Sequence, residues 1–301
     1  MPIQKFHKEF DLEHWKNLFP LSSFAESDYL YPLDGRFITG PVDLIGTLLG
    51  REMQKIPEEF NDTVPCDIFV FGLRQPHRPF LTQIGGIPYR SADKEWPTYK
   101  GKPMVFASQI CFSDSRDILP FDLPGDVLLV FVAEEWVEEI HFEWSHVGEV
   151  RNIIPIEEIP EEGWLRASWE HEKVCFYGEI FRCHDYPNAY NIFHKYEYPE
   201  RFSNKLAILE GTKIGGAKVQ FGYESLDDNF ALRNPGYEML CRIGSILPCS
   251  VMPYSFINFA GSFPLLGPSI SDHYTLLWGD AGGIVVYMNK EGDLLWEFHC
   301  G

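Results

Sequence analysis

Short apolar runs, separated by turns rich in glycine and proline, dominate the pattern along the chain. Residues 66–72 and 127–133 are such runs, and turn-forming residues bound both. Runs of this length and setting predict buried β-strands. Near the C-terminus, residues 283–288 and 294–299 flank a polar turn at 289–293, which predicts a β-hairpin.

Helical spacing is clearest near the N-terminus. After Pro41, apolar residues recur at helical intervals, namely Val42, Ile45, Leu49, Met53 and Ile56. Proline fits the first turn of a helix. We therefore expect a helix here that packs one face on the body of the protein.

One phrase of the sequence occurs twice. Gln83-Ile84-Gly85-Gly86 is echoed by Lys213-Ile214-Gly215-Gly216. The first copy is followed by Ser108-Gln109-Ile110 and the second by Cys241-Arg242-Ile243, each within an apolar run. We interpret this pattern as a degenerate duplication. We expect a single domain of residues 1–301, composed of a helical extension (1–64), a first half-repeat (65–133), an acidic insertion (134–210) and a second half-repeat (211–301).

The paired glycines allow two interpretations. Glycine-rich turns can form a backbone cradle for an anion. However, neither copy has the Gly-x-Gly-x-x-Gly spacing or the Lys-Ser/Thr of a phosphate loop. Glycine also permits strained turns and close backbone packing. We therefore interpret Gly85, Gly86, Gly215 and Gly216 as structural.

Charge and composition narrow the function classes. The net charge of −19 over 301 residues opposes binding to nucleic acid or to an anionic membrane, and it permits a basic protein partner. The 7 cysteines are odd in number and include no Cys-x-x-Cys pair, so we expect reduced thiols. No apolar run is long enough to span a bilayer, and the N-terminus has no apolar signal core. We expect a cytoplasmic protein.

The acidic residues concentrate between residues 134 and 172. This segment holds twelve glutamates, opposed only by Arg151 and Arg166, and four tryptophans lie among them. The segment is too apolar for a disordered acidic tail. The charges are compatible with a solvated face and with a binding face. Exposed aromatic side chains beside charges are typical of binding interfaces, which supports the second interpretation. The expected partner-binding residues are Glu134, Glu135, Trp136, Glu138, Glu139, Glu143, Trp144, Glu157, Glu158, Glu161, Glu162 and Trp164.

Residue types used in catalysis and metal binding also occur. On a strand, His141 and Glu143 would share one side, with His146 as a further metal ligand. Cys183-His184-Asp185 and Ser271-Asp272-His273 contain the types used in nucleophilic catalysis, but residues adjacent in sequence rarely face one another. Loops and an exposed acidic strand explain these residues better. We expect no catalytic residue, no metal site and no cofactor.

The order of the motifs resembles the YwqG-like family, a set of bacterial domains of unknown function. The matching pieces are 83–88, Glu95-Trp96-Pro97, 104–110 and 123–126, and then 213–216 and 277–282. The resemblance covers roughly residues 80 to 299. It implies an α+β fold with an internally duplicated β core, and it carries over no catalytic residues. With the patterns above, we expect a mostly antiparallel β core with a few peripheral helices.

Two functions are compatible with the sequence. The first is a non-enzymatic binding module, most concretely an immunity protein that neutralises a basic toxin, such as a nuclease, through the acidic, Trp-bearing segment. The resemblance adds an association with bacterial toxin–immunity neighbourhoods. The alternative is an enzyme or small-ligand protein with a pocket between the duplicated halves. That pocket would bring the Gly-Gly turns together with Trp278 and Asp280, and His141 and Glu143 would hold a metal.

Overall fold

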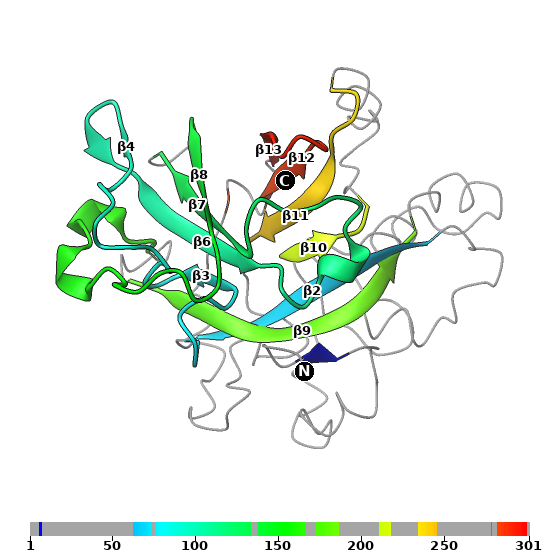
Figure 1. The fold of residues 1–301 in the computed structure, drawn as a ribbon, viewed down its shortest axis with the longest axis horizontal. Coiled ribbons are helices and arrows are strands. Elements are labelled where there is room, and N and C mark those ends of the chain that lie inside the picture. The colour runs from blue at the N-terminus through cyan, green and yellow to red at the C-terminus, as the bar shows by residue number, and fades with distance from the viewer. Residues whose placement is uncertain are drawn as a thin grey trace, which may run out of the picture.

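The structure is a computed structural model that describes residues 6–7, 63–73, 76–133, 138–166, 173–186, 211–217, 234–245, 278 and 282–299. Its main feature is an 11-stranded, mostly antiparallel sheet (Figure 1). In pairing order its main path is β13 (Leu294–His299), β12 (Gly283–Met288), β11 (Glu238–Gly244), β10 (Lys213–Gly215), β2 (Val64–Leu73), β9 (Cys175–Asp185), β3 (Gln83–Gly85), β6 (Val105–Cys111), β7 (Val127–Val132) and β8 (Ile140–Ser145). The short β1 (Phe6–His7) pairs in parallel with β9, and β4 (Thr98–Tyr99) pairs separately with β5 (Lys102–Pro103).

Strands β2 and β9 form the centre of the sheet. Ten residue pairs join them, from Val64 opposite Asp185 to Leu73 opposite Phe176. In Figure 1 they run as long curved ribbons, with β3, β6, β7 and β8 on one side and β10 to β13 on the other. Each central strand therefore carries one half of the sheet. Strand β9 leads to β3-β6-β7-β8, and β2 leads to β10-β11-β12-β13.

The two halves share the same internal register. Residues 83–84 pair with 108–109 in the first half, and residues 213–214 pair with 241–242 in the second. In the next strand pair of each half, β6 with β7 and β11 with β12, the register shifts by one residue. The shift lies at Ala107 in β6 and at Leu240 in β11, each directly before the paired residues named above. The two copies of the repeated phrase therefore occupy equivalent places in the sheet.

A threonine before each inner strand makes the same contact in both halves. Thr82 Oγ1 accepts a hydrogen bond from the Cys111 N–H at 2.9 Å. Thr212 Oγ1 accepts one from the Gly244 N–H at 3.1 Å. Each bond ties the start of an inner strand to the end of its neighbour, which adds a side-chain contact to the backbone pairing.

Both halves contribute to one core cluster on one face of the sheet. The first half supplies Ile84 and Val130, the second supplies Ile214 and Val286, and β2 adds Phe69 between them. All five side chains are almost completely buried. Burial of this shared cluster stabilises both halves together, because removing either half would expose the other to water.

The opposite face of the first half has a core cluster of its own. Phe106 and Phe131 lie at its centre, and Tyr89 comes from the loop that follows the first Gly-Gly pair. Trp96 packs edge-on against Phe131, with ring centroids 5.3 Å apart. The loop over residues 86–104 therefore belongs to the core of the first half.

The expected α+β fold with peripheral helices is wrong. The described residues are mostly antiparallel β-sheet, and their only helical turns are the 3-10 segments η3 (Arg116–Ile118), η4 (Ile156–Glu158) and η5 (Glu161–Gly163). The helix expected after Pro41 lies outside the described residues. Short apolar runs bounded by glycine and proline are typical of strands, and this local signal outweighed the fold implied by the resemblance. That residues 1–301 form a single domain stays a prediction.

The segment 134–210, expected to be an insertion, contributes two strands to the sheet. Strand β8 lies at one end of the strand order, and β9 lies at its centre. The hairpin expected over residues 283–299 is confirmed by the antiparallel pairing of β12 with β13. Its turn is closed by Asn289 Oδ1, which accepts a hydrogen bond from the Asp293 N–H at 2.8 Å.

Both Gly-Gly pairs have left-handed backbone conformations and touch the central strands. The φ angles are 67° and 75° at Gly85 and Gly86, and 63° and 83° at Gly215 and Gly216. A Cβ at Gly86 would lie 2.6 Å from Cys175 Sγ, and one at Gly216 would overlap the Asp185 carboxylate. Only glycine accommodates both the backbone angle and the contact.

We predict that Gly86→Ala destabilises the protein more than Gly101→Ala. Both positions have positive φ, but nothing lies within 4 Å of a Cβ at Gly101. The backbone strain costs about 1–2 kcal/mol at either position, and the clash with Cys175 adds about 1–3 kcal/mol at Gly86 alone. Urea unfolding of the two variants measures the difference. Equal losses would show that the close approach to β9 is unimportant.

Candidate functional site

The structure divides the predicted partner-binding residues into exposed and buried ones. Glu134, Glu135 and Trp136 lie outside the described residues. The exposed ones are Glu138, Glu139, Glu157, Glu158, Glu161 and Glu162. The remaining three, Glu143, Trp144 and Trp164, are buried or partly buried. Six of the predicted glutamates are thus exposed, and Glu143 and the two described tryptophans are less exposed than expected. Whether these residues bind a partner stays a prediction.

Four of the exposed glutamates lie on two successive 3-10 turns, which we call the acidic double turn (residues 156–163). Its turns η4 and η5 carry Glu157 and Glu158, and then Glu161 and Glu162. A proline precedes each turn, with φ of −71° at Pro155 and −54° at Pro160. Proline fixes φ near these values, so the chain enters both turns with little conformational freedom.

The acidic double turn is anchored from beneath by apolar side chains. Ile159 lies between the turns and is buried with Ile154 and Trp164. Gly163 lies against Trp96, where a Cβ would come within 2.8 Å of the indole ring. The inner side of the double turn is therefore held against the first half of the sheet, and its carboxylates face water.

One apolar side chain lies on the outer side. Ile156 is 53 % exposed and is the only large apolar side chain of the described residues in that state. Single exposed apolar residues are common on protein surfaces. Its position matters here because Glu157 and Glu158 follow it directly and are exposed. An apolar centre bordered by charge matches the usual composition of a protein interface.

Most of these carboxylates are not neutralised by nearby cations. Glu161 is paired with Arg166 and with Lys173, the latter at 2.8 Å. These cations lower its pKa. Among the described residues, the structure records no ion pair for Glu157, Glu158 or Glu162. The outer side of the double turn therefore keeps a net negative charge next to Ile156.

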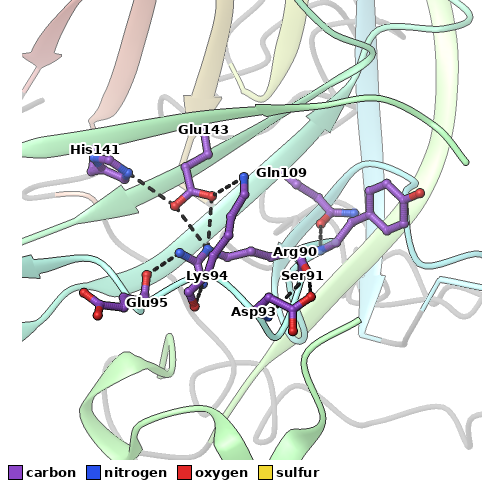
Figure 2. Close-up of polar contacts among 9 residues, drawn as sticks. Arg90, Ser91, Asp93, Lys94, Glu95, Gln109, His141 and Glu143 are labelled. Carbon is purple, nitrogen blue, oxygen red and sulfur yellow. Dashed lines mark hydrogen bonds and ion pairs between the residues drawn. The ribbon is translucent and has the colours of Figure 1, made fainter. Parts of the chain in front are cut away.

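Arg90, in the loop that follows the first Gly-Gly pair, connects this loop to Glu143 of strand β8 (Figure 2). Its Nε donates to both carboxylate oxygens of Glu143 at 3.1 and 3.0 Å. Its Nη1 donates to the Lys94 carbonyl at 2.8 Å, and its Nη2 donates to the Glu95 carbonyl. Arg90 is 2 % exposed, so this is a buried ion pair with its hydrogen bonds satisfied.

The backbone around Arg90 carries the chain that leads into the double turn. The Arg90 carbonyl accepts a hydrogen bond from the Ile154 N–H at 2.9 Å. The Ala92 N–H donates to the Asn152 carbonyl, also at 2.9 Å. Sequence reasoning missed Arg90, although an arginine just after a Gly-Gly-x-Pro turn in an acidic protein was a usable signal.

Glu143 is held by cations of the protein itself. Burial alone would raise the pKa of its carboxyl, but hydrogen bonds and charge from Arg90, with charge from Lys94, hold the pKa below its usual range. His141 Nε2 also lies 3.3 Å from Glu143 Oε1, which confirms that the two side chains share one side of β8. Glu143 is thus engaged with the protein's own cations.

The two described tryptophans of the predicted set face the protein. Trp164 is 7 % exposed, and Lys173 Nζ lies 4.6 Å from its ring centroid. Trp144 packs against Phe112, with ring centroids 5.7 Å apart. Both rings contribute apolar burial to the first half of the sheet, and whether either also contacts a partner stays a prediction.

Several of the residues considered for catalysis or metal binding make other contacts in the structure. His146 Nδ1 lies 3.6 Å from Asp126, away from the His141–Glu143 contact. Asp185 accepts from Lys213 Nζ at 2.6 Å, within a buried ion pair. Ser271-Asp272-His273 lies outside the described residues. Within the residues that the structure describes, no three His, Cys, Asp or Glu side chains are arranged to hold a metal ion.

The groups of the alternative pocket do not converge in the described part of the chain. Gly85 and Gly86 contact residues 165, 174 and 175 and Gln83, whereas Gly215 and Gly216 contact Pro65, Cys66, Ile118 and Asp185. Trp278 is 6 % exposed and belongs to the apolar core, and Asp280 lies outside the described residues. The Gly-Gly turns are filled by protein side chains and backbone, as expected for structural glycines.

Comparison with known families places the chain in one of them. Residues 82–247 match a family described as a domain of unknown function (DUF1963), and the chain belongs to this family. The match begins just before β3 and ends just after β11, so it includes both Gly-Gly turns and the acidic double turn. No curated protein matches the chain. Within the described residues, no helix is long and apolar enough to cross a membrane.

We predict that Arg90→Lys costs about 2–4 kcal/mol of stability, because a lysine cannot reproduce the forked contacts of a buried guanidinium. Arg116→Lys is the matched control. Arg116 Nη2 pairs with Asp126 at 2.8 Å, but its side chain is 45 % exposed. We expect the control to lose less than about 1 kcal/mol. Thermal or urea unfolding provides the comparison, and a similar loss for both would contradict a structural role for Arg90.

The depressed pKa of Glu143 predicts a pH-dependent contribution to stability. A carboxyl whose folded pKa lies below its unfolded value, about 4.3, contributes stability above the unfolded pKa. That contribution is lost as the pH falls through the folded pKa. The free-energy gap between wild type and Glu143→Gln should therefore be largest near neutral pH and shrink in acid. A gap that is constant from neutral pH to about pH 3 would rule out this ion pair as its source.

Proposed function

We propose that this protein is a binding module whose acidic double turn receives a basic surface of a protein partner. The observation that carries the proposal is the exposed Ile156, bordered by Glu157 and Glu158, on a turn that is anchored from beneath. The apolar side chain provides a contact that excludes water, and the carboxylates select a basic partner and raise the association rate.

The rigidity of the double turn supports this role. Two prolines fix its entry angles, and Ile159, Gly163 and Trp164 pack its inner side. A surface that is already ordered loses little conformational entropy on binding, so more of the contact energy appears as affinity. The proposal replaces the expected tryptophan anchors with Ile156, because Trp144 and Trp164 face the core.

In its more specific form, the proposal makes the chain an immunity protein of the YwqG-like family, with a basic toxin such as a nuclease as partner. The net charge of −19 supports this form, since an acidic surface can occupy a cleft built to bind nucleic acid. Such a partner has lysines and arginines around its active cleft. The resemblance to bacterial domains found near toxin genes adds an associational argument.

We predict that reversing the charges beside Ile156 removes binding and leaves the fold intact. Tagged wild type would be purified from its native host, and the partner identified and titrated at low and high salt. Glu157→Lys/Glu158→Lys should weaken binding on the order of tenfold or more, and Ile156→Ala by a similar factor that does not depend on salt. The larger change Glu138→Lys/Glu139→Lys/Glu157→Lys/Glu158→Lys should abolish protection against a toxin partner.

The matched control carries the same charge change far from the double turn. Glu238 and Glu291 are exposed at β11 and at the β12–β13 turn, in the other half of the sheet. Glu238→Lys/Glu291→Lys should bind as the wild type does. An equal loss of affinity in both double variants would show that binding depends on net charge and not on the acidic double turn. Full binding and full protection by the fourfold variant would sink the proposal.

A further inference from the structure

We propose that Cys66 and Cys183 form a reversible cross-strand disulfide when the folded protein meets a peroxide. The two residues face each other at the centre of the sheet, where β2 pairs with β9. Neither is joined in a disulfide in the structure. The inference concerns a modification site within the scaffold and is independent of the proposed partner.

The register places the two side chains on the same face. Cys66 is the direct partner of Cys183 within ten uninterrupted residue pairs. Residues directly opposite each other in an antiparallel pair project their side chains to the same side, with Cβ atoms about 4.5–5.5 Å apart. The two side chains therefore project from the same face of the sheet. Cys66 lies against the Gly215-Gly216 turn, where a Cβ at Gly216 would lie 2.8 Å from Cys66 Cβ.

The direction of the backbone hydrogen bonds along β2 gives the distance between the Cα atoms of Cys66 and Cys183. The Phe69 N–H donates to the Thr212 carbonyl at 3.0 Å, and Thr212 directly precedes β10, on the other side of β2 from β9. The backbone N–H and C=O of Phe69 therefore point away from β9. Alternate residues of a strand turn these groups to alternate sides, so Cys66 turns its own toward β9. Cys66 and Cys183 are then a hydrogen-bonded pair, with Cα atoms about 5.5 Å apart. This Cα separation lies within the 4.4–6.8 Å found in disulfides. The Cβ atoms must approach from about 4.5–5.5 Å to about 3.5–4.5 Å as the bond forms, so the two strands shift slightly on oxidation.

The chemistry consumes one peroxide for each bond formed. Cys183 is 7 % exposed and Cys66 is fully buried, so the peroxide reaches Cys183 first. The Cys183 thiolate attacks one peroxide oxygen, the O–O bond breaks, and the departing oxygen takes a proton and leaves as water. The Cys66 thiolate then attacks the resulting sulfenic sulfur, the S–O bond breaks, and a second water leaves. Two thiols lose two electrons in total, and hydrogen peroxide gains them.

The other described cysteines have no such partner. Cys175 lies opposite Gly85, Cys111 opposite Val127, and Cys241 opposite Val286. A bond from Cys66 to Cys183 would covalently join the two strands that hold the halves together. Burial disfavours the thiolate, so we expect oxidation to be slower than that of an exposed thiol.

The test treats the folded protein with hydrogen peroxide, alkylates it after unfolding, and maps its peptides. Wild type should lose two of its 7 alkylatable thiols and yield a peptide that links Cys66 to Cys183. The urea midpoint should rise by roughly 1 M and return on addition of dithiothreitol. Cys175→Ser should behave as wild type, and Cys183→Ser should form no link.

Trapping the sulfenic acid tests whether Cys183 reacts with the peroxide before Cys66 does. Cys66→Ser should accumulate a sulfenic acid at Cys183 that reacts with dimedone, since the second thiolate is missing. Retention of all thiols by peroxide-treated wild type would overturn the proposal, and so would a link between any other pair. A link formed only after unfolding in urea would also overturn it, because the claim is that the native register creates the bond.

Discussion

The pairing of β2 with β9 is the constraint on which the rest of the structure depends. Within the described residues, the pairing of β2 with β9 joins the two halves of the sheet, and ten residue pairs satisfy their backbone groups in the buried centre. Arg182 adds an ion-pair bridge from β9 to Asp67 of β2 and to Asp117 of η3. Burial raises the pKa of Asp67, and the hydrogen bonds from Arg182 oppose that rise. The ion pair with Arg182 therefore stabilises the buried Asp67 carboxylate where β2 pairs with β9.

The first Gly-Gly turn connects this joint to the surface. Gly85 pairs with Cys175 of β9, and the Gly86 N–H donates to the Val174 carbonyl at 2.9 Å. The chain then passes through Tyr89, whose N–H is held by Gln109 Oε1 at 2.8 Å, and reaches Arg90. Arg90 supports the segment that carries the acidic double turn. The position of the proposed binding surface thus depends on a turn that lies outside the acidic double turn itself.

Sequence reasoning located those parts of the fold that have a local signal. Short apolar runs and turn residues predict the strands at 66–72 and 127–133 and the C-terminal hairpin. The structure contains these elements, and both copies of the repeated phrase occupy equivalent places in it. The role of β9 had no such signal, because its place at the centre depends on pairing with β2 across more than a hundred residues. The strand itself begins just after the acidic stretch of residues 134–172.

The candidate site was predictable only in part, for a related reason. Glu157 and Glu158 are exposed, as their charge requires. Whether a tryptophan beside such charges faces water or the core depends on tertiary packing, and Trp164 is buried against Ile154 and Ile159. Residue type predicted the exposure of Glu157 and Glu158, whereas long-range contacts decided the burial of Glu143 and of the aromatic rings.

The two Gly-Gly copies meet the same packing requirement with different charges. Gln83 Nε2 donates to the Ile87 carbonyl at 2.7 Å, and at the equivalent place Lys213 Nζ donates to the Ala217 carbonyl at 2.8 Å. A buried amide needs no counter-charge, whereas a buried ammonium does. Asp185 supplies it, and its carboxylate fits only because the residue at position 216 has no side chain. Similarity between the copies therefore describes a shared backbone, and the chemistry of one copy does not transfer to the other.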